Sequence, residues 1–364
     1  MIKYLGSKRR LVPVLAALCR ASGARTALDL FTGTTRVAQA FKASGVTVTA
    51  VDSARYAATL ARCYVATDGD RVDHQALDEA LAQLAALPGR AGYVTDVFCR
   101  QARYFQPHNG ARIDAIRDAI RAEHAGSALE PVLLTSLIEA ADRVDSTTGV
   151  QMAYLKGWAP RSHQELTLRR PALLSGPGVA VHGDAVDVAG ALGPFDLAYF
   201  DPPYNQHRYT ANYHVWETIV AWDAPSHYGV ACKRDALRGD EGRSAFNRKA
   251  MMPVALRSVI ESVQAKVLVV SCSDEGWATP EDIAQWCATR EQVVVLGFDS
   301  KRYVGAQIGV FNPSGEKVGR VSHLRNTEYL VLAGPREEVA AMAAAARLPV
   351  EQRPHHGVDV GERR

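Results

Sequence analysis

The chain has 364 residues, of which 47% are hydrophobic and 22% are charged, and its formal net charge is +3. This composition is typical of a globular protein of about two domains, and no apolar run reaches the ~20 residues that a membrane helix needs. The first ten residues lack a signal peptide's apolar core, so we expect a cytoplasmic protein. Because the six cysteines form no Cys-x-x-Cys pair, we expect reduced thiols and no bound metal.

The N-terminal part of the chain predicts a strand, a turn, a helix and a second strand. Residues 26–31 are a short apolar run, residues 34–44 have helical spacing, and residues 46–52 are β-branched and end at an acidic residue. This order is the start of a doubly wound sheet, so we predict an α/β, Rossmann-like fold.

A long segment interrupts that sheet. Residues 70–175 look helical, contain no obvious strand and are too many for a loop, so we predict an inserted helical subdomain. Strand-like runs resume at 179–182, 196–200, 266–272, 292–298 and 326–332. The main domain is therefore predicted to comprise residues 1–69 and 176–350. Residues 351–364 are predicted to form a frayed tail.

A rigid turn follows the predicted strand at 196–200, with the residues Asp201, Pro202, Pro203 and Tyr204. The two prolines stop the strand at its carboxyl end, where open α/β sheets bind ligands. The Asp201 carboxylate and the Pro202 carbonyl would accept the two N–H bonds of an exocyclic amine such as that of adenine, and Tyr204 would stack on the base. Rate would then come from positioning and electrostatics. The alternative is an ordinary tight turn.

A second turn, around Gly33, follows the first predicted strand. A strand that enters a glycine turn and a helix is typical of nucleotide-binding folds. The turn lacks G-x-G-x-x-G, so a nicotinamide cofactor is disfavoured. Asp52 ends the second strand, where an acidic residue commonly accepts hydrogen bonds from ribose. The alternative for Asp52 is a cap on the helix that begins near Ala54.

Other segments complete a recognisable pattern: Lys3–Lys8, Val181–Asp184, Asn205–Glu217, Ser271–Trp277 and Asn326–Leu330. With Asp29–Thr35, Asp52 and Asp201–Tyr204, these segments resemble the Dam-like class of adenine-specific DNA methyltransferases, which includes the modification enzymes of restriction systems. The resemblance spans most of the chain. The Asp-Pro-Pro-Tyr tetrapeptide is its most specific part.

The resemblance implies a mostly parallel sheet flanked by helices, S-adenosylmethionine as methyl donor, and a flipped adenine in double-stranded DNA as substrate. Asp52 would bind ribose, and Asp184 would lie near the cofactor's adenine. The family usually has a second glycine where this chain has Thr35. This departure from the family pattern bears on the geometry of the turn. The implied cofactor-binding residues are Tyr4, Lys8, Asp29, Phe31, Gly33, Asp52, Asp184 and Asp201.

Basic residues in several places would bind DNA phosphates. One cluster lies in the helical insertion and comprises Arg100, Arg103, Arg112, Arg117 and Arg121. The other candidates are Arg169, Arg170, His207, Arg208, Lys233, Arg234, Lys301 and Arg302. A solvated surface is the alternative for each group. Because this class carries its target-recognition region in such an insertion, we hypothesise that residues 70–175 read the DNA sequence.

Other functions remain open at this point. RNA adenine methylation uses the same chemistry, N4-cytosine methylation is disfavoured by Asp201, and a catalytically silent DNA-binding regulator is disfavoured by the intact tetrapeptide. A cognate restriction endonuclease that acts separately is an expected partner, and a membrane is not.

Overall fold

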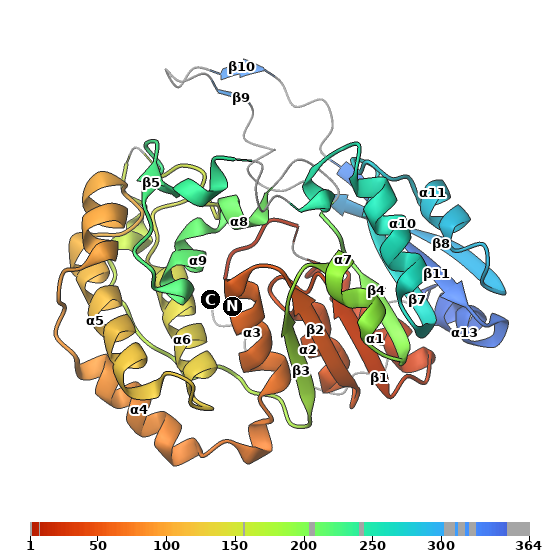
Figure 1. Cartoon of the computed structure of the whole chain (residues 1–364), viewed down its shortest axis with the longest axis horizontal. Helices are drawn as coiled ribbons and strands as arrows, with labels where there is room; N and C mark the ends of the chain where they lie inside the picture. Colours follow the sequence, from red (N-terminus) through yellow and green to blue (C-terminus); the bar gives the residue numbers. More distant parts are fainter. Residues whose placement is uncertain are drawn as a thin grey trace.

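The computed structural model describes residues 2–6, 8–155, 157–203, 208–239, 244–301, 310–311, 317–319 and 325–347. Figure 1 shows a twisted sheet covered by helices on both faces in one half of the molecule and a group of helices in the other half. Among the described residues, every helix is too short or too polar to cross a bilayer. All six cysteines are buried free thiols, as predicted.

A seven-stranded sheet in the order β3-β2-β1-β4-β7-β11-β8 forms the centre of the fold. The pairs from β3 to β7 are parallel, whereas β11 runs antiparallel to both of its neighbours. The strands are β1 (Thr26–Leu30), β2 (Thr47–Asp52), β3 (Gly178–His182), β4 (Phe195–Phe200), β7 (Ala265–Ser273), β8 (Gln292–Lys301) and β11 (Arg325–Gly334). Two small hairpins pair β5 (His227–Tyr228) with β6 (Lys233–Arg234) and β9 (Val310–Phe311) with β10 (Lys317–Gly319).

This sheet confirms the predicted Rossmann-like fold, and each predicted strand is present with small shifts at its ends. The chain moves from β1 outward to β2 and β3 and then returns to the other side of β1 as β4. The carboxyl ends of β1 and β4 therefore lie side by side at a topological switch point, where such sheets bind ligands.

Successive residues of the central strands face opposite layers because side chains alternate along a strand. Leu197 and Tyr199 of β4 lie in one apolar cluster, and Ala198 and Phe200 lie in the other. The first cluster includes residues of α1 (Val12–Ala21), α2 (Arg36–Ala43) and α13 (Arg336–Arg347). The second includes residues of α7 (Ala185–Val188), α10 (Met252–Ser262) and α11 (Pro280–Trp286).

The segment predicted to be helical is helical. Its helices are α4 (His74–Ala86), η3 (Val94–Gln101), α5 (Pro107–His124), α6 (Glu130–Arg143) and the short η4 (Pro160–His163). All of these except η4 share an apolar core with α3 (Arg55–Ala61), which precedes the segment, and α9 (His214–Ala221), which follows the turn after β4. The boundaries at residues 70 and 175 stay a prediction. The core itself crosses them.

The remaining short elements connect these layers. They are η1 (Arg62–Ala66), η2 (Gly69–Arg71), η5 (Ala189–Ala191), α8 (Tyr209–Asn212), η6 (Asp235–Leu237) and η7 (Ala245–Asn247).

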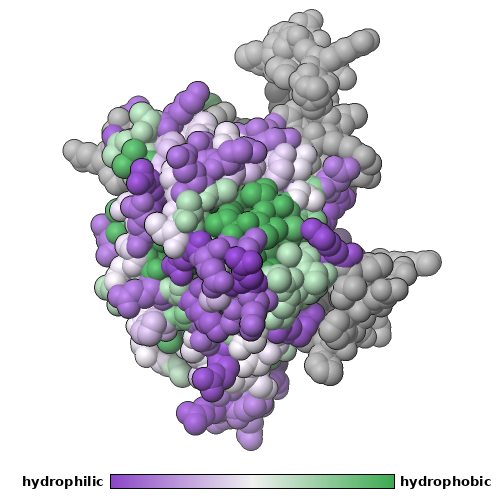
Figure 2. All heavy atoms as spheres, turned by 90° about the vertical axis from the view of Figure 1, so that its right-hand side faces the viewer, coloured by the Kyte–Doolittle hydropathy of each residue, from purple (hydrophilic) through white to green (hydrophobic). Residues whose placement is uncertain are grey.

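The strand β8 forms the edge of the sheet opposite β3, and its Val295 is 43% exposed. Figure 2 looks at this end of the molecule and shows an apolar patch near the middle of the face.

Candidate active site at the carboxyl ends of β1 and β4

The turn after β1 is held by two carboxylates from neighbouring strands. Asp29 accepts hydrogen bonds from the Thr32 hydroxyl at 2.7 Å and the Ala38 amide at 3.1 Å. Asp52 accepts one from the Gly33 amide at 2.9 Å. These bonds hold the turn in an unusual conformation. Phe31, Gly33 and Thr35 all have positive φ there, at 76°, 52° and 63°.

Asp29 is 1% exposed and belongs to the interior of this turn. Burial raises the pKa of its carboxyl to about 7, and the hydrogen bond from Thr32 only partly opposes this shift. Because its oxygens are engaged by the turn, Asp29 organises the backbone that would surround a ligand.

Asp52 has a structural role in addition to its predicted one. Its Oδ1 accepts a hydrogen bond from the Ala54 amide at 2.9 Å, so Asp52 caps the residue just before α3 and not an amide within the first turn of that helix. Burial raises the pKa of this carboxyl, and the bonds from Ala54 and Gly33 oppose the shift. A carboxylate can accept about four hydrogen bonds, so ribose binding stays a prediction beside the cap.

The N-terminal segment crosses the mouth of this turn. The Tyr4 ring stacks on Tyr209 and Tyr213, with centroids 5.3 and 4.8 Å away. A Cβ at Gly33 would lie 3.1 Å from the Tyr4 hydroxyl, so only glycine lets the two segments approach this closely. Burial raises the pKa of Tyr4 well above its usual range, which keeps the phenol neutral.

Lys8 joins the N-terminal segment to the turn after β4. Its ammonium lies 3.2 Å from Asp201 Oδ1 and 2.8 Å from Glu328 Oε2. The Lys8 side chain is 5% exposed, whereas those of Asp201 and Glu328 are 18% and 21% exposed. The predicted catalytic carboxylate is thus held in a largely buried group of three charges.

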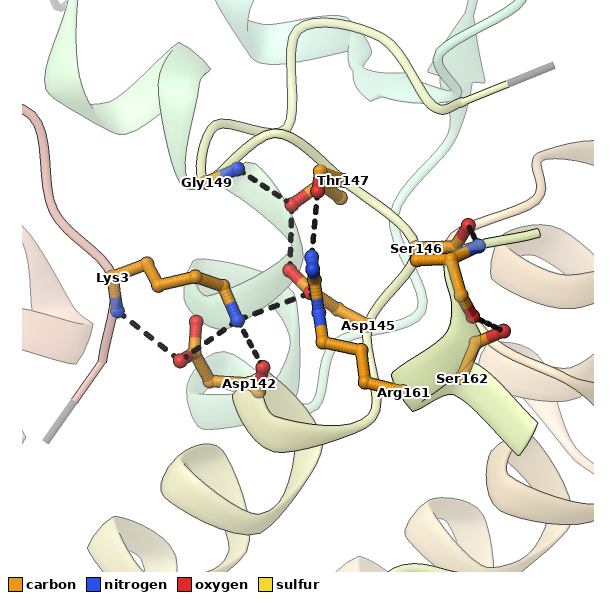
Figure 3. Close-up of polar contacts among 9 residues, drawn as sticks. Lys3, Asp142, Asp145, Ser146, Thr147, Gly149, Arg161 and Ser162 are labelled. Carbon is orange, nitrogen blue, oxygen red and sulfur yellow. Dashed lines mark hydrogen bonds and ion pairs between the residues drawn. The ribbon is translucent and has the colours of Figure 1, made fainter. Parts of the chain in front are cut away.

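Lys3 anchors the same segment to the end of α6 (Figure 3). Its ammonium lies 3.1 Å from carboxylate oxygens of both Asp142 and Asp145, and it also donates to the Asp142 carbonyl. Asp145 also accepts hydrogen bonds from Arg161 and from the Thr147 hydroxyl, both at 2.6 Å. The N-terminal segment is therefore bound directly to the helical unit through these ion pairs.

A small cavity of about 30 Å³ lies at this junction, and its lining includes six of the predicted residues. They are Tyr4, Lys8, Asp29, Phe31, Gly33 and Asp201. A larger groove of about 1070 Å³ runs between α3, the 126–134 segment and the start of β3, and it is lined by none of the predicted cofactor residues. The strand ends and their carboxylates locate the site better than cavity size does.

Comparison with known proteins agrees with this geometry. The family model of the D12 class N6 adenine-specific DNA methyltransferases matches residues 4–265, from the N-terminal segment to the beginning of β7. The chain belongs to this family.

The curated relatives of the chain are modification methylases and type II methyltransferases. The chain is 30% identical over 259 residues to the type II methyltransferase M.NlaIII of Neisseria lactamica, covering 68% of this chain and 75% of that one. It is 28% identical over 301 residues to modification methylase StsI of Streptococcus sanguinis, covering 78% of this chain and 45% of that one. It is 32% identical to M.FokI of Planomicrobium okeanokoites, covering 50% of this chain and 28% of that one. The chain thus spans less than half of two of these three relatives.

The first three residues of the Asp-Pro-Pro-Tyr tetrapeptide lie where the sequence predicts, directly after β4. Pro202 is buried, Pro203 is half-buried, and the Asp201 amide is 3.5 Å from the Leu30 carbonyl of β1. Tyr204 and His207 lie outside the described residues. Asp184 follows β3 and caps α7 by accepting the Val186 amide at 3.0 Å, so its place beside a cofactor stays a prediction.

The predicted DNA-binding residues are dispersed, and some have other partners. Arg100 pairs with Asp96, Arg170 pairs with Asp78, and Arg103 lies over the Trp158 ring. Arg208 donates to the Leu237 carbonyl, and Arg234 is bound by Asp223 through two nitrogens. Arg169 is exposed and Lys233 is half-buried, only the backbone of Lys301 is described, and Arg302 lies outside the described residues. Phosphate contact at these positions stays a prediction.

One member of the first basic cluster must be corrected, and a second has structural partners. Arg117 is 5% exposed and donates to the carbonyls of Ile219 and Val220, which end α9. Arg112 donates to the carbonyls of Ala85 and Leu87 at the end of α4. Both arginines cap helix ends, because the last carbonyls of a helix lack partners within it. Buried Arg117 is therefore part of the packing of the helical unit, whereas Arg112 is half-buried and its contact with phosphate stays a prediction.

Some site residues were not predicted from the sequence. Glu328, Tyr209 and Tyr213 lie in segments that the resemblance singles out, although no catalytic or cofactor role follows for them from the sequence. Asp142 and Asp145 give no local signal, because the partner that identifies them, Lys3, is 139 and 142 residues away.

Proposed function

We propose that this chain transfers a methyl group from S-adenosylmethionine to the N6 amino group of a flipped adenine in double-stranded DNA. We further propose that it is the modification enzyme of a restriction-modification system, which acts in the cytoplasm beside a separate endonuclease. The observation that carries the proposal is the placement of Asp201 at the end of β4, next to the glycine turn after β1.

The chemistry asked of Asp201 follows from the substrate. The lone pair of the adenine amine is delocalised into the ring, so the nitrogen is a poor nucleophile. Acceptors that bind its N–H bonds, here the Asp201 carboxylate and the Pro202 carbonyl, would favour a tetrahedral nitrogen with a free lone pair. The nitrogen loses one proton during the reaction, which passes to the carboxylate or to water. Preorganised acceptors in a partly buried site need little rearrangement for this task.

The residues at the β1 turn fit a nucleoside-type donor. Gly33 leaves the backbone open to close approach, Asp52 offers carboxylate oxygens for ribose, and Phe31 offers an apolar face beside them. The bound donor would supply an electrophilic methyl group on a sulfonium. Small-molecule sites usually enclose about 300–1,000 Å³. The present cavity of about 30 Å³ is smaller, so we infer that Tyr4 moves outward when the donor binds.

The direct test is to identify the product. The purified chain would be incubated with S-adenosylmethionine and DNA from a host that lacks adenine methylation, and the nucleosides would be analysed by mass spectrometry. We expect N6-methyladenine in DNA, at one sequence motif when the modified bases are mapped. Methylation of RNA oligonucleotides but not of DNA would refute the proposal. So would N4-methylcytosine as the product in DNA.

A further inference from the structure

Three segments that are distant in the chain meet at one ammonium group. Lys8 comes from the N-terminal segment, Asp201 follows β4, and Glu328 lies within β11. The strand β7 separates β4 from β11 in the sheet, so the contact reaches across it. The Lys8–Glu328 contact, at 2.8 Å, is shorter than the Lys8–Asp201 contact, at 3.2 Å.

We propose that Glu328 is a positioning residue for methyl transfer, which draws the Lys8 ammonium partly away from Asp201 and so leaves the Asp201 carboxylate available to the adenine amine. This inference rests on the proposed function. Among the contacts between described residues, Glu328 reaches the turn after β4 only through Lys8.

Glu328 changes the charge balance around Lys8. An ammonium that paired with Asp201 alone would form a neutral pair and would compete with the amine for the carboxylate. With Glu328 the three groups carry a formal charge of −1, and the ammonium is shared between two carboxylates. The N–H donors of the substrate then meet a net negative acceptor, and hydrogen bonds to a charged acceptor are stronger than neutral ones.

Two tyrosines near these three groups are uncharged. Tyr199 and Tyr209 lie close enough to Asp201 and Lys8 to interact electrostatically with them. Burial raises the pKa of both phenols well above neutrality, so they stay uncharged. Burial also raises the pKa of the nearby Asp29 to about 7, which reduces its own negative charge.

A purely structural role for Glu328, as a tie between β11 and the N-terminal segment, makes different predictions. Single-turnover methylation would be measured for Glu328→Gln at saturating S-adenosylmethionine and DNA, together with thermal unfolding and both dissociation constants. We expect the single-turnover rate to fall about tenfold or more, with both affinities unchanged. Glu328→Asp, which keeps the charge, should recover part of the rate.

A double-variant comparison tests whether Glu328 acts through Lys8. If it does, the variant with both Lys8→Met and Glu328→Gln should be no slower than Lys8→Met alone. The matched control is Asp274→Asn, because Asp274 accepts a hydrogen bond from the Thr327 amide at 3.0 Å, beside Glu328. This control should keep the wild-type rate.

Three results would overturn the inference: a wild-type single-turnover rate in folded Glu328→Gln, rate losses of Lys8→Met and Glu328→Gln that multiply, or a loss of donor affinity alone. Failure of the proposed function looks different, because the wild-type chain itself would then make no N6-methyladenine.

Discussion

Thr35 has a backbone conformation that its residue type disfavours. Its φ of 63° is in the left-handed region, although threonine is β-branched, and the residue is completely buried at the start of α2. Left-handed geometry costs an L-residue roughly 1–2 kcal/mol. This strain explains in physical terms why the family usually has glycine at the position, and it shows that the turn geometry survives the departure.

Replacing Thr35 with glycine should therefore stabilise the protein. The relief of strain exceeds the roughly 0.5–1 kcal/mol that glycine loses in chain entropy, so we expect a net gain of up to about 1 kcal/mol. Urea unfolding would measure it. Thr34→Gly is the control, because Thr34 is also buried and has no left-handed backbone to relieve, and it should destabilise. A less stable Thr35→Gly would contradict the strain argument.

Asp29 should make stability depend on pH. Its folded-state pKa of about 7 lies above the ordinary value, so the folded state binds the proton more tightly than the unfolded state does. The stabilisation is fully present below about pH 4 and is lost as the pH rises through about 7. Asp29→Asn removes this titration. Relative to wild type, the variant should gain stability between pH 4 and 7, by up to a few kcal/mol in urea unfolding. A difference that is independent of pH would refute the assignment.

Asp201 should be essential for turnover and dispensable for donor binding. We expect Asp201→Ala to lower the methylation rate by about a hundredfold or more, the effect of removing one preorganised polar group from an active site. Calorimetry with S-adenosylmethionine should show nearly unchanged affinity. Asp187→Ala, an exposed change on α7, serves as the control. Wild-type turnover in Asp201→Ala would remove the catalytic assignment.

At the scale of elements, the N-terminal segment connects the helical unit to the active site. Lys3 binds Asp142 and Asp145 at the end of α6. Tyr4 stacks on a tyrosine of α8 and on the tyrosine that follows this helix, and Lys8 binds Asp201. Burial raises the pKa of Asp142 to about 6, and the Lys3 charge opposes the shift. The ion pair thus helps to keep a buried carboxylate charged and the segment in place.

Lys3→Met should loosen this segment. Breaking a fully buried pair costs about 3–5 kcal/mol, and because Lys3 is 36% exposed we expect about 1–3 kcal/mol here. Hydrogen exchange of residues 2–6 should become faster, whereas Arg10→Met, an exposed change, should leave it unaltered. Unaltered exchange in Lys3→Met would show that the aromatic stack alone holds the segment.

At the scale of the whole molecule, the helical unit packs against α3, the same helix that lies on β2 and β3 of the sheet. Tyr56 of α3 and Trp216 of α9 are buried in the same cluster as the helices of residues 70–175. Exchanging that segment with a relative's would therefore disturb the core as well as any DNA contacts. Single exposed arginines give a cleaner test of whether this half binds DNA.

Arg169→Ala should weaken DNA binding uniformly across sequences and reduce the slope of log affinity against log salt by about one, the effect of losing one phosphate contact. Arg257→Ala on α10, which removes an exposed arginine paired with Glu261, is the matched control. An unchanged slope for Arg169→Ala would place the DNA elsewhere on the molecule.

Local patterns in the sequence were enough to predict the central strands, the helical character of residues 70–175, and the turns at Gly33 and at Asp201–Pro203. Alternation, β-branching, glycine and proline act over a few residues, so a linear reading detects them. The switch point then follows from the order of the elements. The role of Arg117 was misjudged, because an arginine in a basic run looks the same in the sequence whether it faces solvent or caps a neighbouring helix.

Only the tertiary structure decided which distant charges meet. Lys8 and Glu328 are 320 residues apart, and Lys3 and Asp142 are 139 apart. No periodicity links them, because their contact depends on the order of strands in the sheet and on the path of the N-terminal segment across it. The chemistry of the tetrapeptide is local to the sequence, whereas the charge balance around Asp201 arises from the fold.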